Sequence, residues 1–188
     1  DLSVVRSTIS NNTAQDGGGG IHAFYEDFLS RDVSIRESTI SSNVGPNGGI
    51  LIGNKFDVEI LHSTIAFNNP VGVSIQTFGN RNLEIHDTIL RNPSGDNCHI
   101  NFAGFIASFT TNIDSDGSCG FSTTKGNLIF VDPQLDLLRD NGGQTPTHAF
   151  LTTASPALDR AGFLSISPCS GVDQRGLPKP VNPINGTA

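Results

Sequence analysis

Val58-Glu59-Ile60-Leu61-His62-Ser63-Thr64-Ile65-Ala66 is one of four near-copies of a single pattern in this chain. In it, Val58 and Ile60 alternate with polar residues, as in a strand with one buried face, and a second short run follows after a break. The other copies are Leu2–Ser10, Val33–Ser41 and Leu83–Leu90. A pattern repeated in this way points to a repeat architecture, so the spacing of the copies decides the fold.

We align the copies on one threonine in each. These threonines are Thr8, Thr39, Thr64 and Thr88, spaced by 31, 25 and 24 residues. A further 24 residues lead to Asn112-Ile113, a degenerate fifth copy. Because Ile60 precedes Thr64 by four residues and Ile85 precedes Thr88 by three, this alignment requires a one-residue deletion in the fourth copy.

Each copy is followed by two further shared features. Four residues after each threonine comes an asparagine: Asn12, Asn43, Asn68 and Asn92. A second short run then follows: Gly20–Ala23, Gly49–Ile52, Gly72–Ile75 and Cys98–Ile100. Units of about 24 residues are too short for a four-stranded propeller blade and lack the leucine-rich-repeat pattern. The sequence therefore predicts an all-β fold, a parallel β-helix of roughly five or six coils.

In such a coil the alternation places Val4, Ile35, Ile60 and Ile85 inside, stacked about 4.8 Å apart. The asparagines share one corner, where they can adopt left-handed backbone angles and hydrogen-bond the copies above and below. The longer first repeat accommodates Phe24–Arg31 as an inserted loop.

Composition limits the possible functions. The 188 residues carry a net charge of −7 and only 15% charged residues, which argues against nucleic-acid binding. No stretch approaches the roughly 20 apolar residues of a membrane span. Because Asp1 opens in the middle of the pattern, with no signal peptide, we expect the chain to be an internal piece of a longer one.

The last third of the chain has a different sequence pattern. Its phrases are Val131-Asp132-Pro133-Gln134-Leu135, Asp140–His148, Ser155-Pro156-Ala157-Leu158-Asp159 and Asp173-Gln174-Arg175-Gly176-Leu177-Pro178. With Asn112–Cys119, they resemble the carboxy-terminal region of bacterial right-handed parallel β-helix proteins of the choice-of-anchor Q type. That group is related to polymorphic outer-membrane-protein repeats and to the pectate-lyase-like superfamily. The resemblance covers essentially the whole chain.

The resemblance implies a right-handed, single-stranded parallel β-helix that is secreted or attached to the cell surface, in a group whose members mostly have no assigned activity. We expect coils over residues 1–131 and an irregular carboxy-terminal capping tail over 132–188, within one structural domain. An open solenoid end exposes unpaired strand edges, so the tail is expected to cap the carboxy-terminal end of the stack. The family's closing cysteine-bearing segment is missing after Val181.

Cysteine usage agrees with an exported protein. Cys98 and Cys119 are 21 residues apart, close to one coil, and stacked positions lie within the range that a disulfide accepts. We predict a Cys98–Cys119 disulfide; the alternative is a pair of buried free thiols, as a cytosolic location would favour. Cys169 is the odd cysteine, and its natural partner would be the missing terminal one.

The catalytic candidates are Glu59, Glu84, His62 and His86. Two acids stack on the outward face of the first strands with the histidines beside them, an arrangement that could bind a metal or do acid–base work. The alternative, which we favour, is the polar outer face that any solenoid needs, since no obvious lysine or arginine lies in register except Arg36 and Arg81.

Other polar residues have structural interpretations that we prefer. Asp114 and Asp116 imitate the opening of a calcium loop without its remaining ligands, so a turn is favoured over a calcium site. We expect His148 to pack the tail on the last coil, and Asp159, Asp173 and Arg175 to form a buried ion pair that pins the tail. Asn11 and Asn185 match the glycan acceptor pattern.

These observations favour a non-catalytic extracellular module for display, adhesion or matrix assembly, without a cofactor unless calcium binds. The alternative is a lyase-like carbohydrate-active enzyme or a polysaccharide-binding module. Expected partners are an extracellular polysaccharide or further copies that associate through the coil ends. We expect no nucleic-acid partner and no membrane span.

Overall fold

The computed structural model describes residues 1–24, 31–76, 81–101, 105–158, 160 and 171–179. Within them the chain forms fifteen short strands and one 3-10 helix, η1 (Thr123–Lys125). No helix in these residues is long and apolar enough to cross a membrane. Isoleucine is by far the commonest residue in the strands, and Gly and Asn separate them, as the β-propensities of these residues favour.

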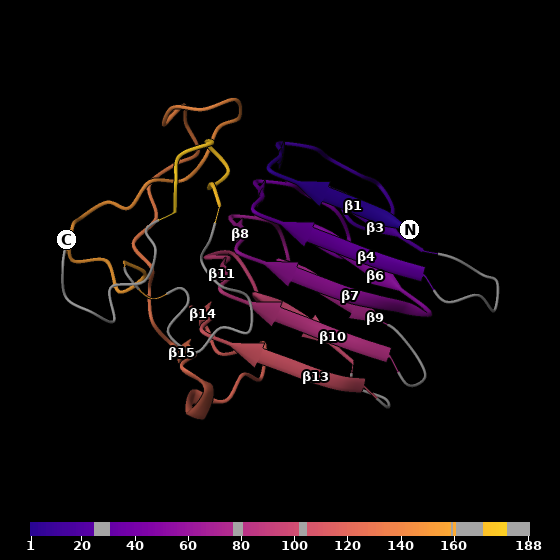
Figure 1. Cartoon of the computed structure of the whole chain (residues 1–188). Helices are drawn as coiled ribbons and strands as arrows, with labels where there is room; N and C mark the ends of the chain where they lie inside the picture. Colours follow the sequence, from indigo (N-terminus) through magenta and orange to yellow (C-terminus); the bar gives the residue numbers. More distant parts are fainter. Residues whose placement is uncertain (25–30, 77–80, 102–104, 159, 161–170, 180–188) are drawn as a thin grey trace.

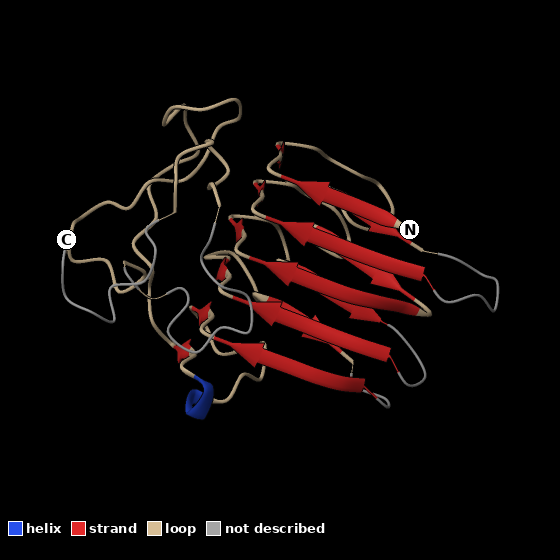
Figure 2. Cartoon of the chain, in the orientation of Figure 1, coloured by secondary structure: helices blue, strands red, loops and turns tan. Residues whose placement is uncertain are grey.

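The strands form three parallel sheets (Figures 1 and 2). The first contains β1 (Leu2–Val5), β4 (Arg31–Arg36), β7 (Phe56–Leu61), β10 (Arg81–His86) and β13 (Phe105–Thr110). The second contains β2 (Thr8–Ser10), β5 (Thr39–Ser41), β8 (Thr64–Ala66), β11 (Ile89–Arg91), β14 (Ile113–Asp114) and β15 (Leu128–Ile129). The third contains β3 (Ile21–Ala23), β6 (Ile50–Gly53), β9 (Val73–Gln76) and β12 (Cys98–Ile100).

Among β1 to β14 the strand number rises by three at each step along a sheet, so each coil contributes one strand to each sheet; β15 follows β14 directly at the end of the second sheet. β1 to β12 form four complete coils, and β13 to β15 continue the stack. This arrangement is a parallel β-helix, which confirms the predicted all-β fold class.

The core is a set of aliphatic columns along the axis. Val4, Ile35, Ile60 and Ile85 are in register, as predicted. The last three are fully buried, whereas Val4, in the first coil, is half-buried.

The predicted deletion in the fourth copy is wrong. Thr64 pairs with Ile89, and Ile60 pairs with Ile85, so both copies keep the same four-residue spacing. Thr88 occupies the position of Ser63, whose amide lies 3.5 Å from the Thr88 hydroxyl. The coils are therefore more regular than the threonine alignment suggested.

Thr88 belongs to a column of inward polar residues between the first and second sheets. In this column the backbone N–H of one residue donates to the side-chain oxygen of the next. Its members are Ser7, Ser38, Ser63, Thr88, Asn112 and Asn127.

The predicted asparagine ladder is confirmed. The N–H groups of Asn12, Asn43 and Asn68 donate to the side-chain oxygens of the asparagines one coil on, at 3.1, 3.0 and 2.7 Å. The predicted left-handed angles belong instead to the preceding residues, with φ between 56° and 58° at Asn11, Ser42 and Phe67. The asparagine side chains therefore satisfy buried backbone groups, and their neighbours turn the chain.

The predicted disulfide is confirmed: Cys98 and Cys119 are bonded, with their Cα atoms 4.8 Å apart. Both residues are buried in the core at the carboxy-terminal end of the stack. Cys169 lies outside the described residues.

Residues 132–158 and 171–179, here called the strap, run along the flank of the second sheet (orange to yellow in Figure 1). The Thr8 hydroxyl donates to Pro146 O at 2.6 Å, and Lys179 pairs with Glu37 at 2.5 Å. These contacts reach the first two coils, so the described tail lies on the flank rather than on the carboxy-terminal end where we expected it. At that end Phe121 is buried against Phe109 instead, with the ring centroids 4.8 Å apart.

Candidate functional site

The two candidate acids lie where the sequence placed them. Glu59 and Glu84 are in register on the outer face of the first sheet. Glu59 accepts a hydrogen bond from the Ser34 hydroxyl at 3.1 Å and pairs with Arg36 at 2.5 Å. Glu84 is half-buried and has no hydrogen-bond or ion-pair partner among the described residues. The charge of Glu59 is thus balanced by Arg36 of the neighbouring coil, whereas Glu84 has no counter-charge among the described residues.

The candidate histidines do not form a pair. His86 is in register with Leu61, at the end of its strand, and His62 lies one residue further on, in the corner position that Asp87 occupies in the next coil. The sequence alignment matched histidine to histidine and was wrong by one residue. His62 and His86 therefore occupy different positions in their coils.

His86 is fully buried although it lies on an outward position. Its Nδ1 lies 2.6 Å from the Thr110 hydroxyl, and its Nε2 has no hydrogen-bond partner among the described residues. Burial lowers the pKa of His86, only partly opposed by Glu84. A neutral, enclosed imidazole suits a structural role.

A column of left-handed residues forms the corner between the first and second sheets, here called the charged corner. Its members are Arg6, Glu37, His62, Asp87 and Thr111, with φ between 44° and 53°. Arg6 lies 4.0 Å from Glu37, and His62 Nδ1 lies 3.6 Å from Asp87. The Thr111 hydroxyl donates to Asp87. Arg6 and Glu37 carry opposite charges, so this pair links the first two coils electrostatically.

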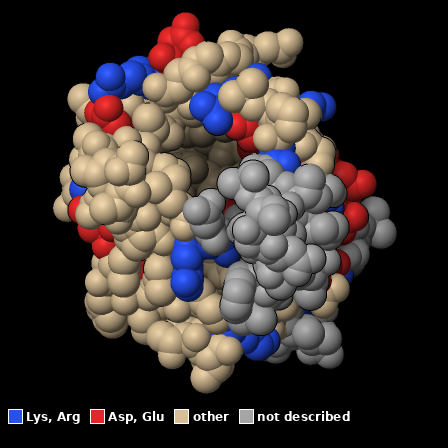
Figure 3. Space-filling view, turned by 60° about the vertical axis from the view of Figure 1, so that its left-hand side comes forward, with Lys and Arg blue, Asp and Glu red and all other residues tan. Residues whose placement is uncertain are grey.

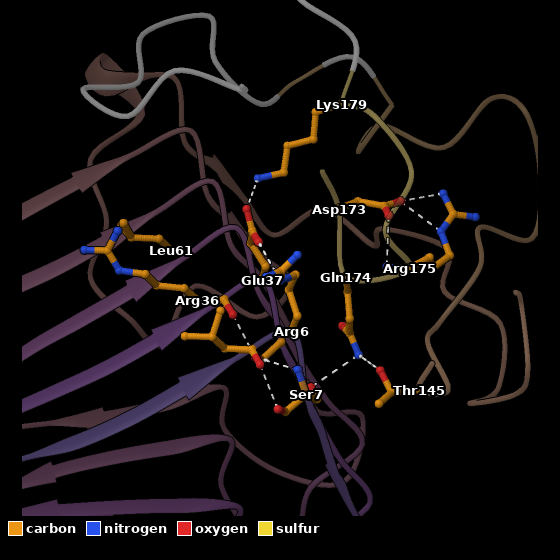
Figure 4. A network of polar contacts seen from close by, with 12 residues as sticks. Arg6, Ser7, Arg36, Glu37, Leu61, Thr145, Asp173, Gln174, Arg175 and Lys179 are labelled. Atoms are coloured by element: carbon orange, nitrogen blue, oxygen red, sulfur yellow. Dashed lines mark hydrogen bonds and ion pairs between the residues drawn. The ribbon is translucent and has the colours of Figure 1, made fainter. Parts of the chain in front are cut away.

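The strap docks on the charged corner (Figure 4). Lys179 Nζ donates to Glu37 at 2.5 Å, and both side chains are mostly buried. Burial lowers the pKa of His62, and the Lys179 ammonium lowers it further, against the opposing effect of Asp87. Lysine, glutamate and histidine here form an inter-segment contact rather than an open site.

Gln174 is the second point of attachment (Figure 4). Its amide nitrogen donates to the Thr8 hydroxyl at 2.8 Å and to the Thr145 hydroxyl at 2.9 Å, and its oxygen accepts from the Thr39 hydroxyl at 2.7 Å. One side chain thereby joins the first coil, the second coil and an earlier part of the strap.

Asp114 and Asp116 lie together in a closed turn. Asp114 takes the inward position of Leu90 and is fully buried. It accepts hydrogen bonds from Asn97 Nδ2 at 2.7 Å and from the Cys119 amide at 2.9 Å. Burial raises the pKa of Asp114, against the effect of these two donors. Asp116 accepts from the Ser118 amide and hydroxyl.

The described residues contain no group of three or more His, Cys, Asp or Glu side chains arranged to hold a metal ion. The oxygens of Asp114 and Asp116 serve the turn, as the hydrogen bonds above show, and the same turn carries Cys119 to its disulfide.

The remaining predicted tail residues are placed as follows. Asp173 pairs with Arg175 at 2.7 Å within the strap, and both side chains are partly exposed, so this is not the buried ion pair that we expected. Asp159 and Asn185 lie outside the described residues. His148 contacts Ser41 in the second coil, not the last coil as we expected.

Viewed from the strap side, Lys and Arg residues alternate with Asp and Glu around a hollow (Figure 3). Among the described residues drawn in this view, neither sign of charge gathers into one patch. Such a mixed surface offers no broad electrostatic attraction to a polyanion.

Sequence reasoning missed the charged corner and the docking role of Gln174. The signal for the corner was present, since each corner residue directly precedes a member of the inward polar column. Docking of the strap has no periodic signal, because its contacts join residues more than 100 positions apart.

We compared the chain with protein-family models, with curated proteins and with solved structures, and none of the three comparisons found a match. The likeness to choice-of-anchor Q proteins therefore rests on the quoted motifs.

Proposed function

We propose that the chain is a rigid, non-catalytic extracellular or cell-surface module of the choice-of-anchor Q type, used for display, adhesion or assembly. The observation that carries this proposal is that glutamate and histidine side chains capable of acid–base chemistry are used in contacts between coils or with the strap. Glu59, Glu37 and His62 all contact charged groups of neighbouring coils or of the strap.

The disulfide supports the extracellular location. Disulfides persist in oxidising compartments, and Cys98–Cys119 joins adjacent coils of the stack. Such a bond, the strap and the polar columns would together give a module that resists proteolysis and mechanical disorder.

One observation favours a second candidate, an acidic-polysaccharide-binding module. Glu84 has no partner among the described residues and lies in register beside Glu59 on the outer face of the first sheet. Two carboxylates in register could share a cation with a sugar acid, as lyase-type sites do.

The experiment is to incubate the folded chain with neutral and acidic polysaccharides, with and without Ca²⁺, and to measure new reducing ends, unsaturated products and binding. We expect no turnover, and the same result for the E59Q/E84Q variant. Turnover that this variant loses would overturn the scaffold proposal. Binding without turnover, lost in the variant, would favour the second candidate.

A further inference from the structure

His148 is one of the residues that attach the strap to the coils. The Nδ1 atom of this imidazole lies 2.6 Å from the Asp136 carbonyl oxygen, and its Nε2 atom lies 2.8 Å from the Ser41 hydroxyl. A carbonyl oxygen only accepts, so Nδ1 carries the proton and donates. In the neutral ring Nε2 then accepts from Ser41, and both ring nitrogens are satisfied.

The ring also packs on the coils. Its centroid lies 5.2 Å from that of Phe67, and the Arg91 guanidinium lies 4.9 Å from the same phenyl ring. Arg91 in turn pairs with Asp132 at 2.9 Å, at the start of the strap. His148, Ser41, Phe67, Arg91 and Asp132 thus form one continuous contact, here called the clasp.

We propose that the clasp is sensitive to protonation: it holds the strap on the coils when His148 is neutral and releases the strap when the imidazole gains a proton. A proton on Nε2 would turn this atom from an acceptor into a donor, so the Ser41 hydroxyl hydrogen would have to rotate away and its oxygen accept instead. It would also place a positive charge near Arg91, at the ring that both groups contact.

The charged groups that face His148 are Asp136 on the strap and Arg91 on the coils. Burial lowers the pKa of His148, Arg91 lowers it further, and the Asp136 carbonyl and carboxylate act in the opposite direction. The net direction is downward, so the docked strap favours the neutral ring. Acid therefore favours release, since a freed imidazole binds its proton at an ordinary pKa.

Release would uncover the outer face of the second sheet. Thr39, Ser41 and Ala66 sit on outward positions of β5 and β8, yet they are 2%, 0% and 0% exposed. A protein that moves from a neutral to a mildly acidic surrounding would thereby present a new face without unfolding its coils.

The test is amide hydrogen exchange of the full chain at about pH 7.5 and about pH 5.5, corrected for intrinsic exchange. The reporters are the strap amides of Asp136, Thr147 and Leu151, which bond within the strap. We expect the strap-opening equilibrium to rise about tenfold on acidification, because protonating one released histidine supplies up to that factor. Amides in β7 and β10 should change far less.

The matched variants are His148→Gln, which cannot titrate, and His99→Gln, at an exposed histidine paired with Asp96. We expect H148Q to remove the acid-induced opening and H99Q to retain it. An equal rise in wild type and H148Q, or no rise in wild type, would overturn the proposal. If the strap of H148Q is already open at neutral pH, a pH titration of the ring resonances of wild-type His148 replaces this comparison. We then expect protonation of His148 and opening of the strap to share one midpoint pH. Separate midpoints would refute the proposal.

Discussion

At the scale of single residues, the fold depends on side chains that complete the backbone hydrogen bonding of the corners. Asn68 is 1% exposed, and its Oδ1 accepts from the N–H of Asn43 at 3.0 Å while its Nδ2 donates to Ile40 O at 3.0 Å. Removing such a group leaves buried donors and acceptors without partners, which costs more than the net value of a hydrogen bond.

The first prediction concerns this residue. Asn68→Ala should lower the free energy of unfolding by about 2–4 kcal/mol, because two or three buried polar groups lose their partner. Asn11→Ala, at an exposed neighbouring corner residue, should cost well under half of that. Urea unfolding followed by circular dichroism measures both, and similar costs would contradict the ladder's role.

The buried turn gives a second prediction. Asp114→Ala should destabilise the chain by about 2–4 kcal/mol, because Asn97 and the Cys119 amide lose a charged acceptor. Asp96→Ala, at an exposed acid nearby, serves as the control. Adding Ca²⁺ should leave the wild-type melting temperature unchanged; a marked rise that D114A abolishes would instead indicate a calcium site.

At the scale of elements, the disulfide and the strap hold parts that the strands do not. Cys98 begins β12, and Cys119 follows the turn that closes the stack. Gln174 makes three hydrogen bonds to side chains of the first two coils and the earlier strap, although it belongs to no strand.

The disulfide prediction follows from loop entropy. The bond closes a loop of 21 residues, so a Cys98→Ser/Cys119→Ser variant should lose about 3 kcal/mol of stability. The wild type under reducing conditions should show a comparable loss in denaturant titration. A variant as stable as the oxidised wild type would show that the bond adds nothing to this stack.

The strap prediction distinguishes docking of the strap from folding of the coils. Gln174→Ala should raise exchange of the strap amides about tenfold, an equilibrium change equal to roughly 1.4 kcal/mol, and leave the coil amides unchanged. Gln144→Ala, at an exposed position in the same strap, should have no effect. If Q174A instead destabilises coils and strap together, strap and coils unfold as one unit.

The sequence predicted the coils well and the strap poorly, for physical reasons. The inward residues Ile35, Ile60 and Ile85 recur every 25 residues, so the stack could be predicted from them. The error at Thr88 arose because a hydroxyl at the inward polar column can come from serine or threonine, which made Thr64 and Thr88 look equivalent. Strap contacts such as His148 with Ser41 pair isolated polar residues with no repeat to reveal them.

At the scale of the whole molecule, the described structure is a stack of coils with a strap along one flank (Figure 2). Three histidines are enclosed among the described residues: His62 in the charged corner, His148 where the strap meets the coils and His86 in the first sheet. Burial is the largest cause of the lowered pKa of each.

This arrangement predicts how stability depends on pH. Each of the three histidines has a folded pKa below the ordinary 6.5, so the unfolded chain binds protons first as the pH falls. Their contribution is fully present above about pH 6.5 and declines from there toward the lower folded pKa values. Calorimetric melting temperatures between neutral and mildly acidic pH should therefore fall. A melting temperature that rises over this window would contradict the burial of neutral imidazoles.

The central claim is that polar side chains from successive coils bind the coils to one another. It is tested most directly by a double-mutant cycle between Asn43 and Asn68, which are 25 positions apart in the sequence but hydrogen-bonded in the ladder. We predict a coupling free energy of about 0.5–3 kcal/mol, the range for residues in direct contact. A coupling indistinguishable from zero, with both single variants folded, would contradict the stacked register and the structural role assigned to the columns.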